Sequence, residues 1–186
     1  MNLKNTTSRF GTLSIGLHWL MLLLLFGVYA CIELREFFPR GSDLREGLKT
    51  WHFMLGLSVF ALVFVRLVIR FAAPTPCIQP EMRAWQLQFA QLTHALLYVF
   101  MIVMPLLGWL TLSAEGKPIP FFGLQLPVLI AADKAFADSV NEIHETIGTI
   151  GYYLIGLHAA AALFHHYVMH DNTLLRMLPR RAHRAG

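Results

Sequence analysis

Residues 141–170 read NEIHETIGTIGYYLIGLHAAAALFHHYVMH, a segment that is long enough to cross a bilayer and that carries five histidines. At about 1.5 Å and about 100° per residue, a helix places His144 and His158 roughly 21 Å apart along its axis and about 40° apart around it. Gly151 falls midway between them. One helix face therefore presents two imidazoles at two depths, separated by bare backbone against which flat rings could lie.

The composition places the chain among membrane proteins, because 56% of its 186 residues are hydrophobic and only 14% are charged. A hydrocarbon core of about 30 Å needs spans of about 20 apolar residues. The uncharged stretches are 11–32, 51–65, 84–114 and 146–170. We therefore predict an all-α integral membrane protein, a single domain over residues 1–186 in which four transmembrane helices form a bundle. The expected helices are about 12–34, 50–71, 89–113 and 140–170.

The basic residues predict the orientation of the chain. One side carries nine of them against Glu81 and Asp171, whereas the other side, with loops 35–49 and 114–139, carries six against nine acidic residues. We expect a multi-pass protein of the bacterial inner membrane with both termini in the cytoplasm and these two loops in the periplasm. The nine basic residues are Lys4, Arg9, Arg66, Arg70, Arg83, Arg176, Arg180, Arg181 and Arg184.

The first span could instead be a signal peptide, since basic residues precede it and the run VYAC at 28–31 resembles a lipoprotein cleavage site. Its apolar run exceeds the about 7 to 15 residues of a signal-peptide core, and Tyr29 is bulky where a small residue is needed. We expect the span, and His18 within it, to be retained.

Loop 114–139 is the longest connection, and Pro120, Gly123 and Pro127 break its apolar portion, so it is not expected to span. We predict a cap on the outer ends of the bundle. Ser139, with Glu142 three residues later, is the expected N-cap of the fourth helix.

Four histidines fall into two pairs on this topology. His18 and His158 lie in the cytoplasmic half, and His52 and His144 lie near the outer surface. Facing helices that each contribute one imidazole can hold a six-coordinate haem, so the sequence predicts two stacked b-type haems. His94 also lies in the cytoplasmic half, and spacing alone leaves it open as the partner of His158.

Covalent c-type haem is excluded, because neither Cys31 nor Cys77 belongs to a C-x-x-C-H motif. Arg66 and Arg70, four residues apart, share a helix face near the cytoplasmic boundary. Two interpretations of this pair remain open: the side chains reach the lipid headgroups, or a guanidinium such as that of Arg66 neutralises haem propionates.

His165 continues the seven-residue series of His144, Gly151 and His158 on the same helix face. Near the inner boundary, its neutral ring could donate a hydrogen bond to a quinone carbonyl and pass on a proton. An interfacial polar residue without a ligand is the alternative for His165, and it is the favoured interpretation for His166 and His170.

The histidine spacing resembles that of the bacterial cytochrome b561 family, and so do three runs of sequence. Within that family the match is to the di-haem superoxide oxidase type. The resemblance covers residues 9–181. The runs are ELREFFPRGSDL at 33–44, RLVIRFAAPTP at 66–76 and GYYLIGLHAAAALFHHYVMHDNTLLRMLPR at 151–180.

This resemblance implies that His18 and His158 ligate the cytoplasmic-side haem iron and that His52 and His144 ligate the periplasmic-side one. It favours His18 over His94 and places the quinone contact at His165. It also implies an enzyme, a superoxide:ubiquinone oxidoreductase that oxidises superoxide in the periplasm and passes electrons through both haems to ubiquinone. The cations expected to attract superoxide are Arg40, Lys49 and Lys117.

Two other functions are weighed against this one. A cytochrome subunit that relays electrons between the quinone pool and a partner dehydrogenase would use the same four ligands. A transporter or metal-binding module would instead hold zinc or copper, and paired broken helices would support it. No nucleic-acid motif is found, and no partner beyond lipid, superoxide and quinone is required.

Overall fold

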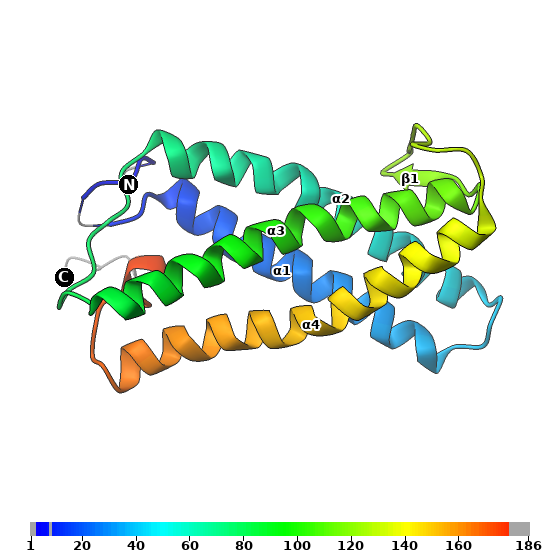
Figure 1. Cartoon of the computed structure of the whole chain (residues 1–186). Helices are drawn as coiled ribbons and strands as arrows, with labels where there is room; N and C mark the ends of the chain where they lie inside the picture. The colour runs from blue at the N-terminus through cyan, green and yellow to red at the C-terminus, as the bar shows by residue number, and fades with distance from the viewer. Residues whose placement is uncertain (1–2, 8, 179–186) are drawn as a thin grey trace, which may run out of the picture.

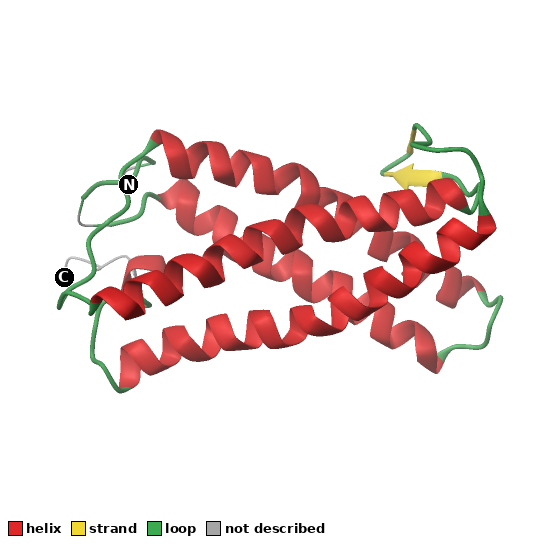
Figure 2. Ribbon diagram, in the orientation of Figure 1, coloured by secondary structure: helices red, strands yellow, loops and turns green. Residues whose placement is uncertain are grey.

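A computed structural model describes residues 3–7 and 9–178. Within that part of the chain, four long α-helices are apolar enough to cross a membrane (Figures 1 and 2). This confirms the predicted fold class. The helices are α1 (Thr12–Leu34), α2 (Asp43–Ala72), α3 (Ala84–Ala114) and α4 (Lys134–Tyr167). The shorter elements are the 3₁₀ turns η1 (Arg35–Phe37) and η2 (Leu175–Met177) and the antiparallel hairpin of β1 (Ile119–Phe121) and β2 (Leu124–Leu126).

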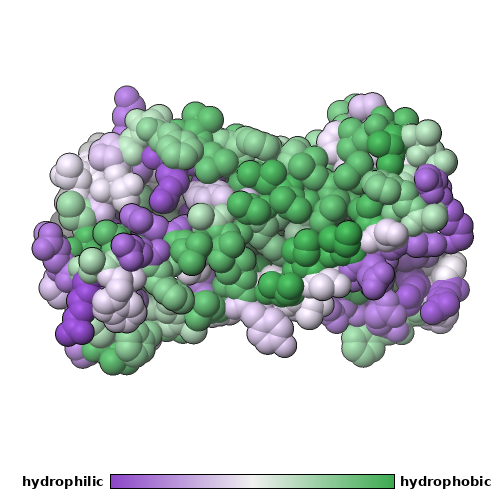
Figure 3. Space-filling view, in the orientation of Figure 1, coloured by the Kyte–Doolittle hydropathy of each residue, from purple (hydrophilic) through white to green (hydrophobic). Residues whose placement is uncertain are grey.

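The helices run side by side along the molecule (Figure 1). On the face drawn in Figure 3, hydrophobic residues cover the middle and hydrophilic residues gather toward the two ends. We call the end with the N-terminus and η2 the terminal end, and the end with β1 and β2 the hairpin end. The centre of the bundle is closed by a buried cluster from α1, α2 and α3, against which partly buried side chains of α4 pack. The cluster comprises Met21, Val59, Val63, Phe100 and Met101. The bundle is thus packed at its middle.

Three helices begin earlier than the sequence predicted. Helix α2 begins at Asp43 rather than near residue 50, because the Ser42 hydroxyl accepts a hydrogen bond from the Arg45 N–H at 3.4 Å. Helix α3 begins at Ala84 rather than near 89, where Arg83 and Gln86 form a capping box. The first turns of these helices are polar and lie before the apolar spans. The charged residues in the sequence therefore indicate where the hydrocarbon region ends, and the helices continue beyond it.

Helix α4 begins at Lys134, and its N-cap is Asp133 instead of the predicted Ser139. The Asp133 carboxylate accepts a hydrogen bond from the Phe136 N–H at 3.0 Å, whereas the Ser139 hydroxyl donates to a carbonyl inside the helix. The helix ends at Tyr167 and not at His170, which has the left-handed φ of 54°. The chain therefore turns sharply just after α4.

The hairpin does not simply cap the ends of the helices but packs on the flanks of α2 and α3. Ile119 is 1% exposed and packs with Leu57 and Leu112. The indole N–H of Trp109 donates to the Pro127 carbonyl at 2.9 Å. The sequence missed this arrangement because the contacts join residues that are far apart along the chain. Arg180, Arg181 and Arg184, used for the topology prediction, lie outside the described residues.

Candidate functional site

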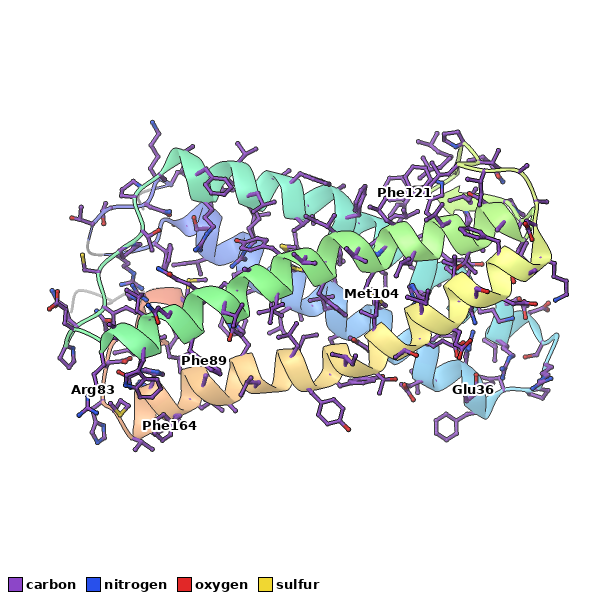
Figure 4. All side chains as sticks on the ribbon, viewed as in Figure 1. Glu36, Arg83, Phe89, Met104, Phe121 and Phe164 are labelled. Atoms are coloured by element: carbon purple, nitrogen blue, oxygen red, sulfur yellow. The ribbon has the colours of Figure 1, made fainter. Side chains whose placement is uncertain are left out.

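At the hairpin end, His52 of α2 faces His144 of α4, with ring centroids 6.2 Å apart. The Nδ1–H of His52 donates to the Val28 carbonyl at 2.9 Å, which leaves Nε2 with its lone pair free. His144 Nδ1 is buried without a fully formed hydrogen bond, beside the backbone of Met104. Met104 lies where α3 passes α4 (Figure 4). The two rings thus place nitrogen donors between two helices.

A cavity of about 660 Å³, open to the surface, lies beside these two imidazoles. Its walls are almost wholly apolar, as the walls of small-molecule sites usually are. Side chains such as Phe53, Met101 and Ile119 line it. An apolar cavity with two facing nitrogens suits a flat apolar ring system whose metal needs two axial ligands.

At the terminal end, three imidazoles come together from three helices. The ring centroids of His18 in α1 and His158 in α4 are 6.2 Å apart, and those of His94 in α3 and His158 are 5.2 Å apart. Imidazoles on opposite faces of one metal have centroids roughly 6 Å apart, because each metal–nitrogen bond is about 2.0 Å and each nitrogen is about 1 Å from its ring centre. The spacing therefore fits a bound haem for His52 with His144 and for His18 with His158.

The ring spacing favours His18 as the partner of His158, but the hydrogen bonds of the rings favour His94. The Nδ1–H of His94 donates to the Ala90 carbonyl at 2.6 Å, which leaves its Nε2 free. By contrast, Arg66 Nη2 donates to His18 Nδ1 at 3.1 Å, so the proton of neutral His18 is on Nε2. His18 can ligate a metal through Nε2 only after Arg66 releases Nδ1.

The Arg66 side chain turns into the bundle and not toward the headgroups. Besides contacting His18, its Nε lies 3.3 Å from the Tyr98 hydroxyl. The exposed guanidinium of Arg70 lies 5.8 Å above the same phenol ring. This arrangement supplies positive charge beside the three imidazoles, as a carboxylate-bearing ligand would require.

Gly151 lies between the two imidazole clusters, and its surroundings correct one expectation. The Tyr29 hydroxyl and the Phe100 ring occupy the space that a side chain at Gly151 would need. The same hydroxyl donates to the Gly148 carbonyl at 2.8 Å. The bare backbone is therefore covered by protein side chains rather than left open to a flat ring.

His165 lies at the terminal end with a partner that the sequence did not reveal. Its Nδ1 is 2.6 Å from a carboxylate oxygen of Asp171, and both residues line a pocket of about 220 Å³. Burial acts to raise the pKa of Asp171, but hydrogen bonds, including that from the Thr173 N–H, hold it below its ordinary value. His166 instead packs against the Tyr167 ring.

The three predicted superoxide-attracting cations all lie near the hairpin end, and their surroundings differ. Lys49 is paired with Glu46 at 2.8 Å, and Lys117 with Glu115 at 3.0 Å. Arg40 is exposed and makes no ion pair with any residue that the structure describes. The charge of Arg40 is therefore the least compensated of the three.

A metal ion held by side chains alone is not supported. Within residues 3–7 and 9–178, no group of three His, Cys, Asp or Glu side chains, the three terminal-end imidazoles included, is arranged so that it could hold a metal ion by itself. Cys31 and Cys77 are free thiols. The donors that do converge are paired imidazoles, and these suit a metal that a macrocycle already holds.

Comparisons with known proteins identify the family of the chain. The family model described as prokaryotic cytochrome b561 matches residues 9–180. Cytochrome b561 homolog 1 of Escherichia coli K12 is 41% identical over 94% of this chain and 99% of the relative. Probable superoxide oxidase CybB of Yersinia pestis is 38% identical over 93% and 97%. Cytochrome b561 homolog 2 of Escherichia coli K12 is 27% identical over 96% and 95%. The chain therefore belongs to the prokaryotic cytochrome b561 family of b-type haem oxidoreductases and is a four-helix, multi-pass membrane protein.

Proposed function

We propose that this chain oxidises superoxide at the hairpin end and reduces ubiquinone at the terminal end. Two superoxide anions, one ubiquinone and two protons would give two dioxygen molecules and one ubiquinol. The observation that carries the proposal is the pair of 6.2 Å imidazole spacings, one near each end of the bundle. The similarity to a protein named probable superoxide oxidase supports the choice of donor.

The four imidazoles would hold two b-type haems, His52 with His144 and His18 with His158. When bound, the haems would supply one-electron transfer between the two half-reactions. Arg66, released from His18, would neutralise propionate charge at the terminal-end site. Because the four imidazoles serve as ligands, other side chains must bind the two substrates.

Charge at the two ends supports this assignment of substrates. Uncompensated Arg40 would raise the local concentration of an anion at the hairpin end, with Lys49 and Lys117 adding less because glutamates neutralise them. At the terminal end, His165 would contact a quinone carbonyl. We place the hairpin end in the periplasm and the terminal end in the cytoplasm of the bacterial inner membrane, as the distribution of basic residues predicts.

The test uses the purified, haem-loaded protein, and a reduced-minus-oxidised visible spectrum first establishes that haem is bound. Superoxide from xanthine oxidase is then supplied together with ubiquinone-1, and ubiquinol formation is followed by absorbance. We expect reduction well above the uncatalysed rate, one quinol for every two superoxide anions, and suppression by added superoxide dismutase. The matched variant is His144→Ala, which should lose this activity.

Quinone reduction no faster than in protein-free buffer would contradict the proposal. The better account would then be a cytochrome subunit that relays electrons between the quinone pool and a partner dehydrogenase with the same four histidines. Copurification with an extramembrane subunit would support that alternative.

A further inference from the structure

The turn after α4 brings a carboxylate back to the ring of His165. His170 adopts the left-handed backbone conformation that reverses the chain, and the next residue, Asp171, is buried. One carboxylate oxygen of Asp171 lies 2.6 Å from His165 Nδ1, and the other accepts the Thr173 N–H at 2.8 Å. The backbone N–H of Asp171 also donates to the His165 carbonyl. Two separate contacts therefore tie Asp171 to His165.

The segment between α2 and α3 fixes this turn independently of the imidazole. The Asn172 N–H donates to the Gln79 carbonyl at 3.1 Å, and the Gln79 N–H donates to the Asn172 side chain at 3.0 Å. Arg176 also donates to the Pro76 carbonyl, at 2.5 Å. Because the two hydrogen bonds between Gln79 and Asn172 do not involve the carboxylate of Asp171, an asparagine at position 171 should leave the turn in place.

A carboxylate in this position determines which ring nitrogen is available. His165 Nδ1–H donates to Asp171, so Nε2 is the nitrogen left for a ligand in the adjoining pocket. The pocket, about 220 Å³, is also lined by Glu81, Met82 and Gln86. The charged groups that face the pair are Glu81 from the α2–α3 segment and Arg176 from η2, which interacts electrostatically with Asp171.

We propose that Asp171 is a positioning residue that holds His165 with Nε2 directed to the quinone, so that His165 can protonate one quinone carbonyl. This inference rests on the proposed function. As the quinone gains two electrons from two superoxide anions, the His165 ring, which then carries a proton on each nitrogen, gives up the one on Nε2: the Nε2–H bond breaks and an O–H bond forms at the carbonyl oxygen. Two protons from the bulk solution, relayed by water in the pocket, restore the Nε2 proton of the ring and protonate the other quinone oxygen. The Asp171 carboxylate compensates the charge of the ring whenever it carries both protons.

The experiment compares Asp171→Asn, His165→Ala and the double variant, all purified with haem. Each single change should lower the rate of ubiquinone-1 reduction by about tenfold to a hundredfold. The equilibrium Kd for ubiquinone-1 in Asp171→Asn should change by less than about threefold, because its pocket retains its shape. In the His165→Ala background, Asp171→Asn should cause no further loss, since Asp171 acts through His165.

Asp138→Asn is the matched control, because it removes one exposed carboxylate at the hairpin end, and it should react as the unsubstituted protein does. A second assay mixes ubiquinol-1 with oxidised protein and follows haem reduction without superoxide. Slow haem reduction in Asp171→Asn supports the inference even where superoxide oxidation fails. A full rate in Asp171→Asn, or an additive loss in the double variant, would overturn the inference while leaving the proposed function intact.

Discussion

The two imidazole pairs have the same 6.2 Å ring spacing but different surroundings. At the hairpin end, His52 donates to a backbone carbonyl and the cavity beside it is almost wholly apolar. At the terminal end, His18 accepts from Arg66, and a third imidazole, that of His94, stands beside His158. Two haems with the same pair of ligands have different reduction potentials if the charges around them differ, because nearby positive charge favours the reduced iron. We therefore expect the terminal-end haem to have the higher potential and electrons to move toward it.

The largest expected effect separates the two candidate partners of His158. His18→Ala should lose the terminal-end haem and keep the other, because its ring spacing fits a bound metal. His94→Ala should keep both haems, and its neutral ring makes it the matched control. Haem per protein, measured as the pyridine haemochrome, distinguishes the two variants. Loss of haem from His94→Ala alone would show that His94, whose hydrogen bond leaves Nε2 free, is the partner of His158 in place of His18.

The packed region between the two pairs gives the next effect. Gly151→Ala places a methyl group against Tyr29 and Phe100, and we expect it to destabilise the protein by about 1–3 kcal/mol. Gly156→Ala in the same helix meets nothing within 4 Å, so it should be neutral or stabilising by up to about 1 kcal/mol. Thermal unfolding of the two haem-loaded variants in detergent measures the difference. Equal Tm values would mean that the space beside Gly151 is open.

The electrostatic contrast between the ends is tested by Arg66→Leu. The Arg66 guanidinium points into the bundle, and its removal should lower the midpoint potential of the terminal-end haem by about 60 mV. This shift corresponds to a tenfold change in a one-electron equilibrium. The hairpin-end potential should stay unchanged. Arg70→Leu, which removes an exposed charge, should have a smaller effect because water screens it. Redox titration followed by the visible spectrum measures both midpoint potentials. An equal shift of the two potentials in Arg66→Leu would show that Arg66 does not act on the terminal-end haem alone.

The smallest expected effect concerns substrate attraction at the hairpin end. Arg40→Gln should lower the superoxide-dependent rate by about two- to threefold at low ionic strength and hardly at all at high salt. Lys4→Gln removes an exposed charge near the terminal end and should leave the rate unchanged at any salt concentration. Steady-state rates at two salt concentrations are the measurement. An equal loss in both variants would indicate an effect of net charge and not of a local site.

Much of the fold followed from the sequence because the deciding signals are local. Apolar length and the absence of charge located four spans. The seven-residue series His144, Gly151, His158 and His165 predicts that the candidate residues of α4 share one helix face. The ends of the helices were less predictable. Ser42 and Asp133 cap polar turns beyond the apolar spans, so composition alone gave starts that were too late.

The features that sequence reasoning missed all depend on contacts between distant segments. The hairpin lies on α2 and α3 because Trp109 bonds to Pro127 and Ile119 fits between Leu57 and Leu112. Asp171 belongs to no recognisable sequence motif, and its carboxylate lies beside His165 only because the chain turns after α4. Arg66 was one of two equivalent arginines in the sequence, and the fold distinguishes them by placing Arg66 beside His18.

Haem content in α4 variants is the decisive measurement of whether these imidazoles hold two haems, because this one helix contributes an imidazole to each pair. We expect about two haems per chain in the unsubstituted protein. His144→Ala should retain only the terminal-end haem, His158→Ala only the hairpin-end haem, and the double variant neither. A His158→Ala protein that kept its full complement of both haems would show that His158 is not a haem ligand and that the proposed pairing is wrong.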